Sequence, residues 1–461
     1  MDNIKNIYFV GIGGIGMSAI ARHFKALGKN VAGYDRTRTE LTDEIVSEGI
    51  DITFEDDVNT IPHSFKDKES TIVVITPAIP ADNAIRLFFE KGGYNIMKRA
   101  AMLGKLTSMA SAICIAGTHG KTTTSTMVAH VMRSSEVGCS AFLGGVSANY
   151  NTNYWSNTSS SFVVTEADEY DRSFLHLHPY LSLITAMDAD HLDIYGTHEE
   201  VLNAFHKFAS QTELGGAVVY KYGLPFEEGE IDEDCEIFTY SLKNREADFY
   251  AFDVKLHGSR STFSLHTPFG VIKGVELGIP GFHNVENAVA ASALSLLAGV
   301  TEVELIDALK TFKGNRRRFQ YRIDENDFCL IDDYAHHPEE IRSMLVSLRQ
   351  MYQNRKVTVV FQPHLYTRTR DFADDFADVL SLADRVLLLD IYPARELPIE
   401  GVTSSMLLDK IHGISAQLSS KERLFDDIVS QPLDVLVMMG AGNIDVMISD
   451  IERQIREYKH I

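Results

Sequence analysis

The stretch YFVGIGGIGMSAIARHF, residues 8–24, decides the first part of the fold. An apolar run leads into a glycine-rich turn, and an amphipathic segment follows. Gly11, Gly13 and Gly16 match the pattern G-x-G-x-x-G, and Asp35 ends the next apolar run. A strand, a glycine turn and a helix in this order indicate a unit whose backbone amides hold the diphosphate of a dinucleotide. The stretch alone leaves open whether that diphosphate belongs to NAD or to another nucleotide.

Apolar runs of this kind recur along the chain and alternate with helix-like segments, as in STIVVITPAIP, AICIAGTHG, SFVVTEADE, KVTVVFQPH and DVLVMMGAGN. Continuous apolar strands that alternate with helices predict parallel sheets covered on both faces, with ligands at the carboxyl ends of the strands. Polar or glycine residues stand at those ends, namely Thr76, Thr118, Glu166, Asp188, Gln362, Asp390 and Gly440. We therefore predict an α/β protein.

A chain of 461 residues has room for about three domains. We predict a Rossmann-like domain over residues 1–105, a central P-loop ATPase domain with a parallel sheet over 106–314, and a second Rossmann-like domain over 315–461. Segments of alternating polarity between residues 216 and 280 predict a small β insertion made of hairpins.

The composition excludes several classes of function. The net charge is −21, with 64 acidic and 43 basic residues, which argues against binding to nucleic acids or anionic membranes. The four cysteines form no C-x-x-C pair, so neither a zinc site nor a disulfide framework is indicated. The chain enters a predicted strand at once, lacks a signal-peptide layout and has no apolar run of membrane-spanning length. We expect a cytoplasmic monomer or homodimer without membrane insertion.

A second phosphate-type loop lies in AGTHGKTTT, residues 116–124. It follows an apolar strand and opens a helix, where amides and the helix dipole favour an anion. Lys121 can reach the β- and γ-phosphates, and Thr122 can offer a hydroxyl to Mg²⁺. The loop is tighter than a full Walker A motif, because position 115 is Ile and Gly117 stands two residues later. A glycine-rich helix cap with a chance lysine is the alternative interpretation.

Carboxylates follow the next two apolar runs. Glu166, Asp168 and Glu169 lie in SFVVTEADEYD, while Asp188, Asp190 and His191 lie in ITAMDADHLDIYG. Mg²⁺ prefers oxygen ligands and shares them with phosphate, so these residues are candidates for a metal site. Acidic helix caps and a structural histidine are the simpler explanations. Two separate phosphate loops in one chain favour a ligase that activates a nucleotide-linked substrate with ATP over a dehydrogenase.

The sequence resembles the Mur ligase family in eleven segments that occur in the same order along the chain. They are GIGGIGMSAIA, TPAIP, AGTHGKTTT, EADEYDRSFL, DADHLDIYG, GFHNVENAVAA, RRRFQ, DDYAHHPEEI, FQPHLYTRTRDF, DIYPARE and MGAGNI. The resemblance implies one domain each for a UDP-linked substrate, ATP and the incoming amino acid. It also implies ATP-dependent joining of L-alanine to the lactyl carboxylate of UDP-N-acetylmuramate through an acyl phosphate, a step of peptidoglycan precursor synthesis.

The resemblance assigns roles to individual residues. The first loop would bind the UDP diphosphate rather than NAD, through Gly11, Gly13, Gly14, Gly16 and Thr76, with Asp35 near the uridine end. ATP would contact Gly117, Thr118, His119, Gly120, Lys121, Thr122 and Thr123, with Asn284 and Asn287 near the adenine, Arg318 at the phosphates and Asp333 at the ribose. Thr122, Glu166 and His191 would hold Mg²⁺, in two ions, and the catalytic set would be Lys121, Glu166, His191 and Arg318.

The same resemblance implies that Tyr334, His336, His364 and Arg368 bind L-alanine. Position 365 is Leu where many family members have Arg, which leaves Arg368 and Arg370 as candidates to hold the alanine carboxylate. Locally, the asparagines also fit helix caps and Arg318 fits an ordinary basic linker.

Three alternatives remain at this point. The first is a related ligase that adds a preformed peptide to UDP-N-acetylmuramate or glutamate to a folate. The second is an NAD-dependent oxidoreductase that uses residues 8–35, against which GTHGKTT and the two acidic segments argue. The third is a nucleotide sensor without catalytic activity.

Overall fold

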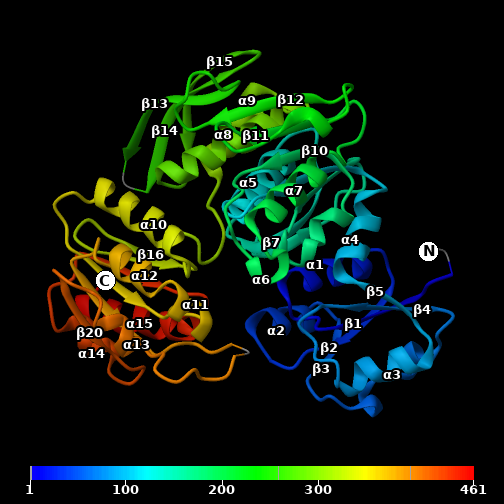
Figure 1. Cartoon of the computed structure of the whole chain (residues 1–461), viewed down its shortest axis with the longest axis horizontal. Helices are drawn as coiled ribbons and strands as arrows, with labels where there is room; N and C mark the ends of the chain where they lie inside the picture. The colour runs from blue at the N-terminus through cyan, green and yellow to red at the C-terminus, as the bar shows by residue number, and fades with distance from the viewer. Residues whose placement is uncertain (1–2, 258, 395) are drawn as a thin grey trace. The chain divides into compact units, whose positions relative to one another are not determined.

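The computed structural model describes residues 3–257, 259–394 and 396–461, which form three sheets of five, ten and six strands (Figure 1). The chain divides into two compact units. The first two sheets lie in the first unit and the third sheet lies in the second. Helices alternate with the strands of each sheet, so the predicted α/β class is confirmed. Within the described part of the chain, no helix is both long and apolar enough to cross a bilayer.

The first sheet is parallel and has the strand order β3-β2-β1-β4-β5. Its strands are β1 (Asn6–Val10), β2 (Asn30–Tyr34), β3 (Asp51–Thr53), β4 (Thr71–Ile75) and β5 (Asn95–Lys98). Its helices are α1 (Ile15–Ala26), α2 (Glu40–Ser47), α3 (Ala84–Gly92) and α4 (Arg99–Thr107), with the 3-10 helices η1 (Val58–Thr60) and η2 (His63–Lys66). Ile7 and Phe9 join the core that contains α1, whereas Tyr8 and Val10 join the core that contains α3. Burial on both faces explains the unbroken apolar run in β1.

The second sheet has the order β15-β14-β13-β12-β11-β10-β6-β9-β7-β8. Its strands are β6 (Ser111–Ala116), β7 (Ser140–Ser147), β8 (Thr152–Trp155), β9 (Phe162–Glu166), β10 (Pro179–Ile184), β11 (Ala217–Lys221), β12 (Glu236–Ser241), β13 (Phe249–His257), β14 (Arg260–Thr267) and β15 (Gly270–Leu277). The helices are α5 (Lys121–Arg133), η3 (Tyr170–His176), α6 (Leu192–Tyr195), α7 (His198–Ala209), η4 (Glu228–Glu230), α8 (Phe282–Leu297) and α9 (Glu302–Thr311). Parallel pairing of β6 with β9 and β10 brings three strand ends together, since Glu166 is level with Ile115 and Ile184 with Ala116.

The segment between residues 216 and 280 is only partly the set of hairpins that we predicted. Strands β14 and β15 do pair antiparallel, as a hairpin requires. Strands β11 and β12 pair in parallel instead, and so do β12 and β13. A parallel pair needs a crossover rather than a tight turn. Between β11 and β12, residues 222–235 supply it, and they include η4 and the acidic run EEGEIDED at 227–234. The segment therefore extends the central sheet.

The third sheet has the order β16-β17-β21-β18-β19-β20 and is parallel except at the edge strand β16. Its strands are β16 (Gln320–Asp324), β17 (Cys329–Asp333), β18 (Val357–Phe361), β19 (Arg385–Leu388), β20 (Ser415–Leu418) and β21 (Val435–Met439). Its helices are α10 (Pro338–Met351), α11 (Tyr366–Asp371), α12 (Ala373–Leu380), α13 (Ser404–Leu408), α14 (Leu424–Val429) and α15 (Ile444–Lys459). One core contains α10, α12 and α13, and the other contains α14 and α15, so helices cover both faces.

Candidate active site

The second phosphate loop joins β6 to α5 at the carboxyl edge of the central sheet. Gly117 has φ +136°, and a Cβ there would lie 2.0 Å from Thr185 Oγ1. Gly120 has φ +80° and directly precedes α5, which begins at Lys121. Both conformations favour glycine. The loop therefore turns tightly into a helix of 13 residues, whose first amides and positive dipole end favour an anion.

Lys121 is anchored at the mouth of this loop. Its Nζ donates to the Gly117 carbonyl at 2.5 Å and lies 2.7 Å from Glu169 Oε2. Burial would raise the pKa of Glu169, but the charge of Lys121 outweighs it and lowers that pKa to about 2. Burial likewise would lower the pKa of Lys121, but the charges of Glu169 and Glu166 raise it. Both groups are therefore charged at neutral pH, and the ammonium is held at the loop.

Thr122 and Glu166 form the oxygen-rich side of the site. Thr122 Oγ1 donates to Glu166 Oε2 at 2.9 Å. Mg²⁺ binds oxygen at about 2.1 Å in octahedral geometry, which puts neighbouring ligand oxygens about 3 Å apart. The hydroxyl and carboxylate therefore fit one Mg²⁺ in both chemistry and spacing. Gly144 of β7 makes room for the carboxylate, because a Cβ there would lie 2.0 Å from Glu166 Oε2.

His191 lies on the other side of the lysine. Its Nε2 is 3.6 Å from Glu169 Oε1 and 3.7 Å from Asp190 Oδ2. Burial would lower the pKa of His191, but the Glu169 hydrogen bond and the Asp190 charge raise it. Across the described residues, no three His, Cys, Asp or Glu side chains form a ready metal cluster. The structure thus places His191 beside Glu169, and its role as a ligand of a second metal ion stays a prediction.

The remaining candidates for ATP contacts in the first unit lie in the second loop with the start of α5, and on α8. Thr118 Oγ1 donates to Asp188 Oδ2 at 3.1 Å, and His119 Nε2 lies 3.5 Å from the same oxygen, so the acidic segment after β10 does meet the loop. Thr123 lies in the first turn of α5. On α8, Asn287 Oδ1 lies 3.0 Å from the Cβ position of Gly120, and Asn284 is buried in the same helix. Asn287 thus borders the loop, and the contact of both asparagines with the adenine stays a prediction.

The first phosphate loop joins β1 to α1. Gly11 has φ +94° and packs against the Thr76 methyl group, where a Cβ would lie 2.5 Å from Cγ2. Asp35 Oδ2 accepts a hydrogen bond from the Gly13 amide at 2.8 Å. Asp35 Oδ1 accepts from the Thr37 amide at 3.1 Å. Asp35, predicted near the uridine end, therefore holds the glycine loop itself.

The two glycines nearest α1 differ from Gly11. Gly14 caps the helix with φ −65°, and a Cβ there would meet nothing closer than 3.6 Å, so the chain itself does not require glycine. Gly16 lies in the first turn of α1, and a Cβ there would lie 2.8 Å from Arg99 Nη1. The absence of a side chain at Gly16 thus lets Arg99 lie over the start of the helix.

Helix α1 is tied to the central sheet by a buried asparagine. Asn153 of β8 donates from Nδ2 to the Ile15 carbonyl at 2.6 Å and to Ser18 Oγ at 2.9 Å. Its Oδ1 accepts a hydrogen bond from Arg22, which also pairs with Glu48 at 2.6 Å. The side chains of Asn153, Ser18 and Arg22 are buried. The first loop is therefore fixed to the same unit as the second.

A cavity of about 120 Å³ extends from the start of α1, at the first loop, to Glu166, which accepts a hydrogen bond from Thr122 of the second loop. Gly16 and Arg99 line one part of it, and Glu166 with Gly144 lines another. Most of the other lining side chains are apolar and come from α1, α4, β7 and η3. A ligand whose diphosphate binds to the first loop can therefore extend toward the Glu166 carboxylate, which lies beside the second loop.

The candidates of the second unit gather after β17 and β18. His336 Nδ1 lies 3.0 Å from the Tyr334 carbonyl and 3.3 Å from Glu340, and burial lowers the pKa of its ring. The His364 ring lies 5.9 Å from the His336 ring. Arg368 on α11 is half-buried, and its side chain makes no hydrogen bond or ion pair with any residue that the structure describes. A half-buried cation of this kind is suited to an external carboxylate.

The predicted ATP contacts of the second unit have partners of their own. Asp333 accepts the amides of Phe319 and Ala335, each at 2.7 Å, and burial raises its pKa. Arg318 Nη1 lies 3.4 Å from Glu340 Oε1. These bonds position both side chains within the second unit, and their contact with ATP stays a prediction. Leu365, at the start of α11, has φ +71°, a conformation that disfavours a bulky side chain.

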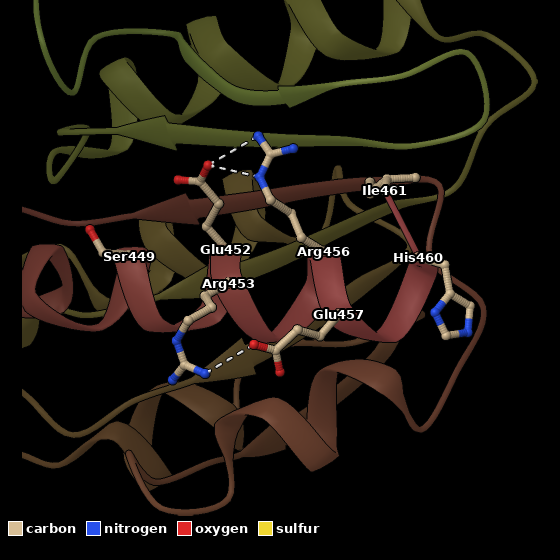
Figure 2. Close-up of a pocket in the computed structure, with 7 residues that line it drawn as sticks. All are labelled: Ser449, Glu452, Arg453, Arg456, Glu457, His460 and Ile461. Carbon is tan, nitrogen blue, oxygen red and sulfur yellow. Dashed lines mark hydrogen bonds and ion pairs between the residues drawn. The ribbon is translucent and has the colours of Figure 1, made fainter.

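A second surface pocket, of about 410 Å³, contains none of these candidates (Figure 2). It lies along the last turns of α15, where Arg456 pairs with Glu452 and Arg453 pairs with Glu457. Because each of these arginines is neutralised by a glutamate on its own helix, the pocket has no excess charge for an anionic nucleotide. It is not part of the candidate site.

Sequence reasoning named Glu169 among the acidic residues but gave it no role, and it missed Arg99 and Gly144. Glu169 is the partner of Lys121, three residues beyond the metal candidate Glu166. Gly144 belongs to a strand that is distant in sequence, and its role depends on the register of β7 beside β9. A glycine pair in the middle of an apolar strand, GG at 144–145, was the available signal. Arg99 had none.

Comparison with known proteins gives the family. The model of the Mur ligase family catalytic domain matches residues 6–110, the Mur ligase middle domain matches 115–295, and the Mur ligase glutamate ligase domain matches 317–442. The chain belongs to the Mur ligase family. The first loop of this Mur ligase lies in the first matched region, and its second loop lies in the second.

Individual relatives agree over the full length of this Mur ligase. It is 48% identical over 454 residues to UDP-N-acetylmuramate–L-alanine ligase of Porphyromonas gingivalis. The aligned region covers 98% of this chain and 99% of the relative. The crystal structure of UDP-N-acetylmuramate-alanine ligase from Thermotoga maritima matches it with a TM-score of 0.82 and 28% identity over 99% of both chains. A murein peptide ligase from Psychrobacter arcticus shares the fold, with a TM-score of 0.71 and 22% identity over 97% of this chain and 98% of that chain.

Proposed function

We propose that this Mur ligase joins L-alanine to the lactyl carboxylate of UDP-N-acetylmuramate at the expense of ATP. The ligated product of this reaction is UDP-N-acetylmuramoyl-L-alanine, and the other products are ADP and phosphate. The observation that carries the proposal is the cavity that connects the glycine loop of residues 11–16 to Glu166 beside the loop of residues 117–123. A dehydrogenase has no use for the second loop, whereas a ligase needs both anionic substrates close together.

The chain's own residues supply most of what this reaction needs. The terminal phosphoryl group of ATP moves to the lactyl carboxylate, and the alanine amine then displaces phosphate from the acyl phosphate. Two anions must approach each other, so the amides of the second loop and the Lys121 ammonium lower the repulsion. Thr122 and Glu166 would hold Mg²⁺, which when bound neutralises charge on the transferring group. Holding both substrates in one unit supplies proximity.

Glu169 has a positioning role in this scheme. Its buried carboxylate holds the Lys121 Nζ at 2.7 Å, beside the Gly117 carbonyl. An ammonium fixed at one point needs no reorganisation when a phosphate arrives. His191 contacts Glu169, and this contact supports a role for the histidine at the phosphate site. We further propose that His191 binds a second Mg²⁺ ion.

The amino acid would bind in the second unit. Arg368 would offer its guanidinium to the alanine carboxylate. Tyr334, His336 and His364, whose rings contact one another, would complete the proposed site. We assign the three domains to residues 1–105, 106–314 and 315–461, for the UDP-substrate, ATP and the amino acid respectively. Identity of 48% with an L-alanine ligase, against 22% with a murein peptide ligase, favours L-alanine over a preformed peptide.

A panel of amino acceptors tests this assignment. Phosphate release is measured with ATP, Mg²⁺ and UDP-N-acetylmuramate, and with L-alanine, glycine, L-serine, L-glutamate or the tripeptide as acceptor. We expect the highest kcat/KM with L-alanine. Activity with the tripeptide but not with L-alanine would assign the chain to the peptide-adding branch of the family. Titration with NADH is the control for the dehydrogenase alternative, and we expect no binding.

A further inference from the structure

Arg99 is a cation that lines the cavity running from the start of α1 to Glu166, and the proposed mechanism does not use it. It is the first residue of α4. Its Nη2 donates to Asp168 Oδ2 at 2.8 Å, and its Nη1 lies 2.8 Å from the Cβ position of Gly16 in the first turn of α1. The guanidinium therefore lies between the first glycine loop and the segment that follows Glu166.

The guanidinium is held in place but keeps most of its hydrogen-bonding capacity. Arg99 has five N–H donors, and its bond to Asp168 is the one that its side chain makes within the described residues. Its side chain is 26% exposed and that of Asp168 is 36% exposed. A single carboxylate fixes one edge of the guanidinium, while the remaining donors face the cavity region that Arg99 lines.

Charged groups of both signs line the cavity. At the Gly16 end lie the positive dipole end of α1 and the Arg99 guanidinium. Asp168, which accepts the Arg99 hydrogen bond, lies at this same end. The Glu166 carboxylate, which belongs to the proposed metal pair, also lines the cavity. A ligand with a diphosphate and a separate carboxylate would place the diphosphate at the positive end and the carboxylate at the metal.

We propose that Arg99 binds the diphosphate of the UDP-linked substrate, together with the amides at the start of α1, and that Asp168 positions its guanidinium. This inference rests on the proposed function, because it assumes that a UDP-sugar occupies the first loop. A guanidinium binds phosphate through two parallel charge-assisted hydrogen bonds. Glycine at position 16 leaves room for this arrangement, because a Cβ there would lie 2.8 Å from Arg99 Nη1 and the guanidinium would have to shift. Arg99 thus explains one glycine of the first loop that backbone conformation does not.

Isothermal titration of the full chain with three probes tests the assignment. The probes are UDP, UDP-N-acetylglucosamine and UDP-N-acetylmuramate, of which the last alone carries the lactyl carboxylate. We expect Arg99→Ala to weaken all three about 10- to 100-fold, the value of one charge-assisted contact with phosphate. Arg99→Lys should recover part of the loss, because it keeps the charge without the planar fork. Lys105→Ala, which removes an exposed cation from the same helix, is the matched control and should leave the three affinities unchanged.

Two results would overturn the proposal. If Arg99→Ala weakens only UDP-N-acetylmuramate, the guanidinium binds the lactyl carboxylate and not the diphosphate. If the variant lowers the melting temperature and leaves all three affinities intact, Arg99 is a structural link between α4 and the segment that follows β9. In steady-state assays we expect a raised KM for UDP-N-acetylmuramate with kcat and the KM for ATP nearly unchanged, the sign of lost uniform binding. Failure of the wild-type protein to use L-alanine would refute the proposed function instead, and the binding data would still decide the role of Arg99.

Discussion

Replacing Gly144 with Ala should displace the metal-binding carboxylate without touching it directly. The new Cβ would lie 2.0 Å from Glu166 Oε2 and 2.6 Å from its Cδ, whereas real Cβ contacts are essentially never closer than 3.0 Å. The carboxylate must therefore move by about 1 Å or more from its place beside Thr122. A misplacement of about 1 Å at a reacting centre can cost about 100-fold in rate, which corresponds to about 2.7 kcal/mol of transition-state free energy.

The assay is L-alanine-dependent phosphate release at increasing Mg²⁺. We expect Gly144→Ala to lower kcat about 100-fold and to raise the Mg²⁺ concentration needed for half-maximal rate, with UDP binding unchanged. Gly229→Ala is the matched control, since a Cβ at that exposed position of η4 meets nothing within 4 Å. The reasoning is refuted if Gly144→Ala keeps wild-type kcat and Mg²⁺ dependence, because Glu166 would then not need its present position.

Three further predictions concern other parts of the first unit. Lys121→Ala should reduce turnover at least about 1,000-fold and lower the melting temperature, because the buried Glu169 carboxylate loses its ammonium partner. The double variant Lys121→Ala/Glu169→Gln should recover the melting temperature but not the turnover, and recovered turnover would contradict the role of the lysine. Asn153→Ala should lower the free energy of unfolding by about 2–4 kcal/mol in urea denaturation, because two hydrogen bonds to α1 are lost and Arg22 loses a buried partner. A loss below about 0.5 kcal/mol would show that the hydrogen bonds of Asn153 to α1 do not stabilise the fold. Burial lowers the pKa of His130 to about 4, and its Nε2 must donate to the Ala308 carbonyl, so the neutral ring is the folded form. The folded state then binds fewer protons than the unfolded state between pH 6.5 and 4, so stability should fall as pH falls through this window; a His130→Gln variant that keeps the same pH dependence would contradict the assignment.

The layout of the sheets could be predicted because burial on both faces leaves a direct trace in the sequence. The apolar run of β1 joins two helical layers, and Ile7 and Tyr8 belong to different cores although they are adjacent. The parallel pairing of β11 with β12 could not be predicted, because the crossover of residues 222–235 has a polar composition that also suits a loop between antiparallel strands.

The candidate site divides in the same way. Lys121, Thr122 and Glu166 follow apolar strands directly, and the register of parallel neighbours brings such positions together. Asp35 also ends a strand, but its carboxylate turned inward to the Gly13 amide, because an exposed loop amide and a nearby carboxylate satisfy each other. Gly144 and Arg99 act through contacts between segments that are distant in sequence. No local pattern encodes such contacts, so only the structure could reveal them.

Incorporation of labelled L-alanine tests the central claim most directly. The purified chain is incubated with ATP, Mg²⁺ and labelled L-alanine, with or without UDP-N-acetylmuramate, and labelled nucleotide-linked product and released phosphate are counted. We expect one labelled product per phosphate, complete dependence on UDP-N-acetylmuramate, and loss of both signals in Lys121→Ala. Phosphate release that does not depend on UDP-N-acetylmuramate, or labelling by the tripeptide in place of L-alanine, would contradict it.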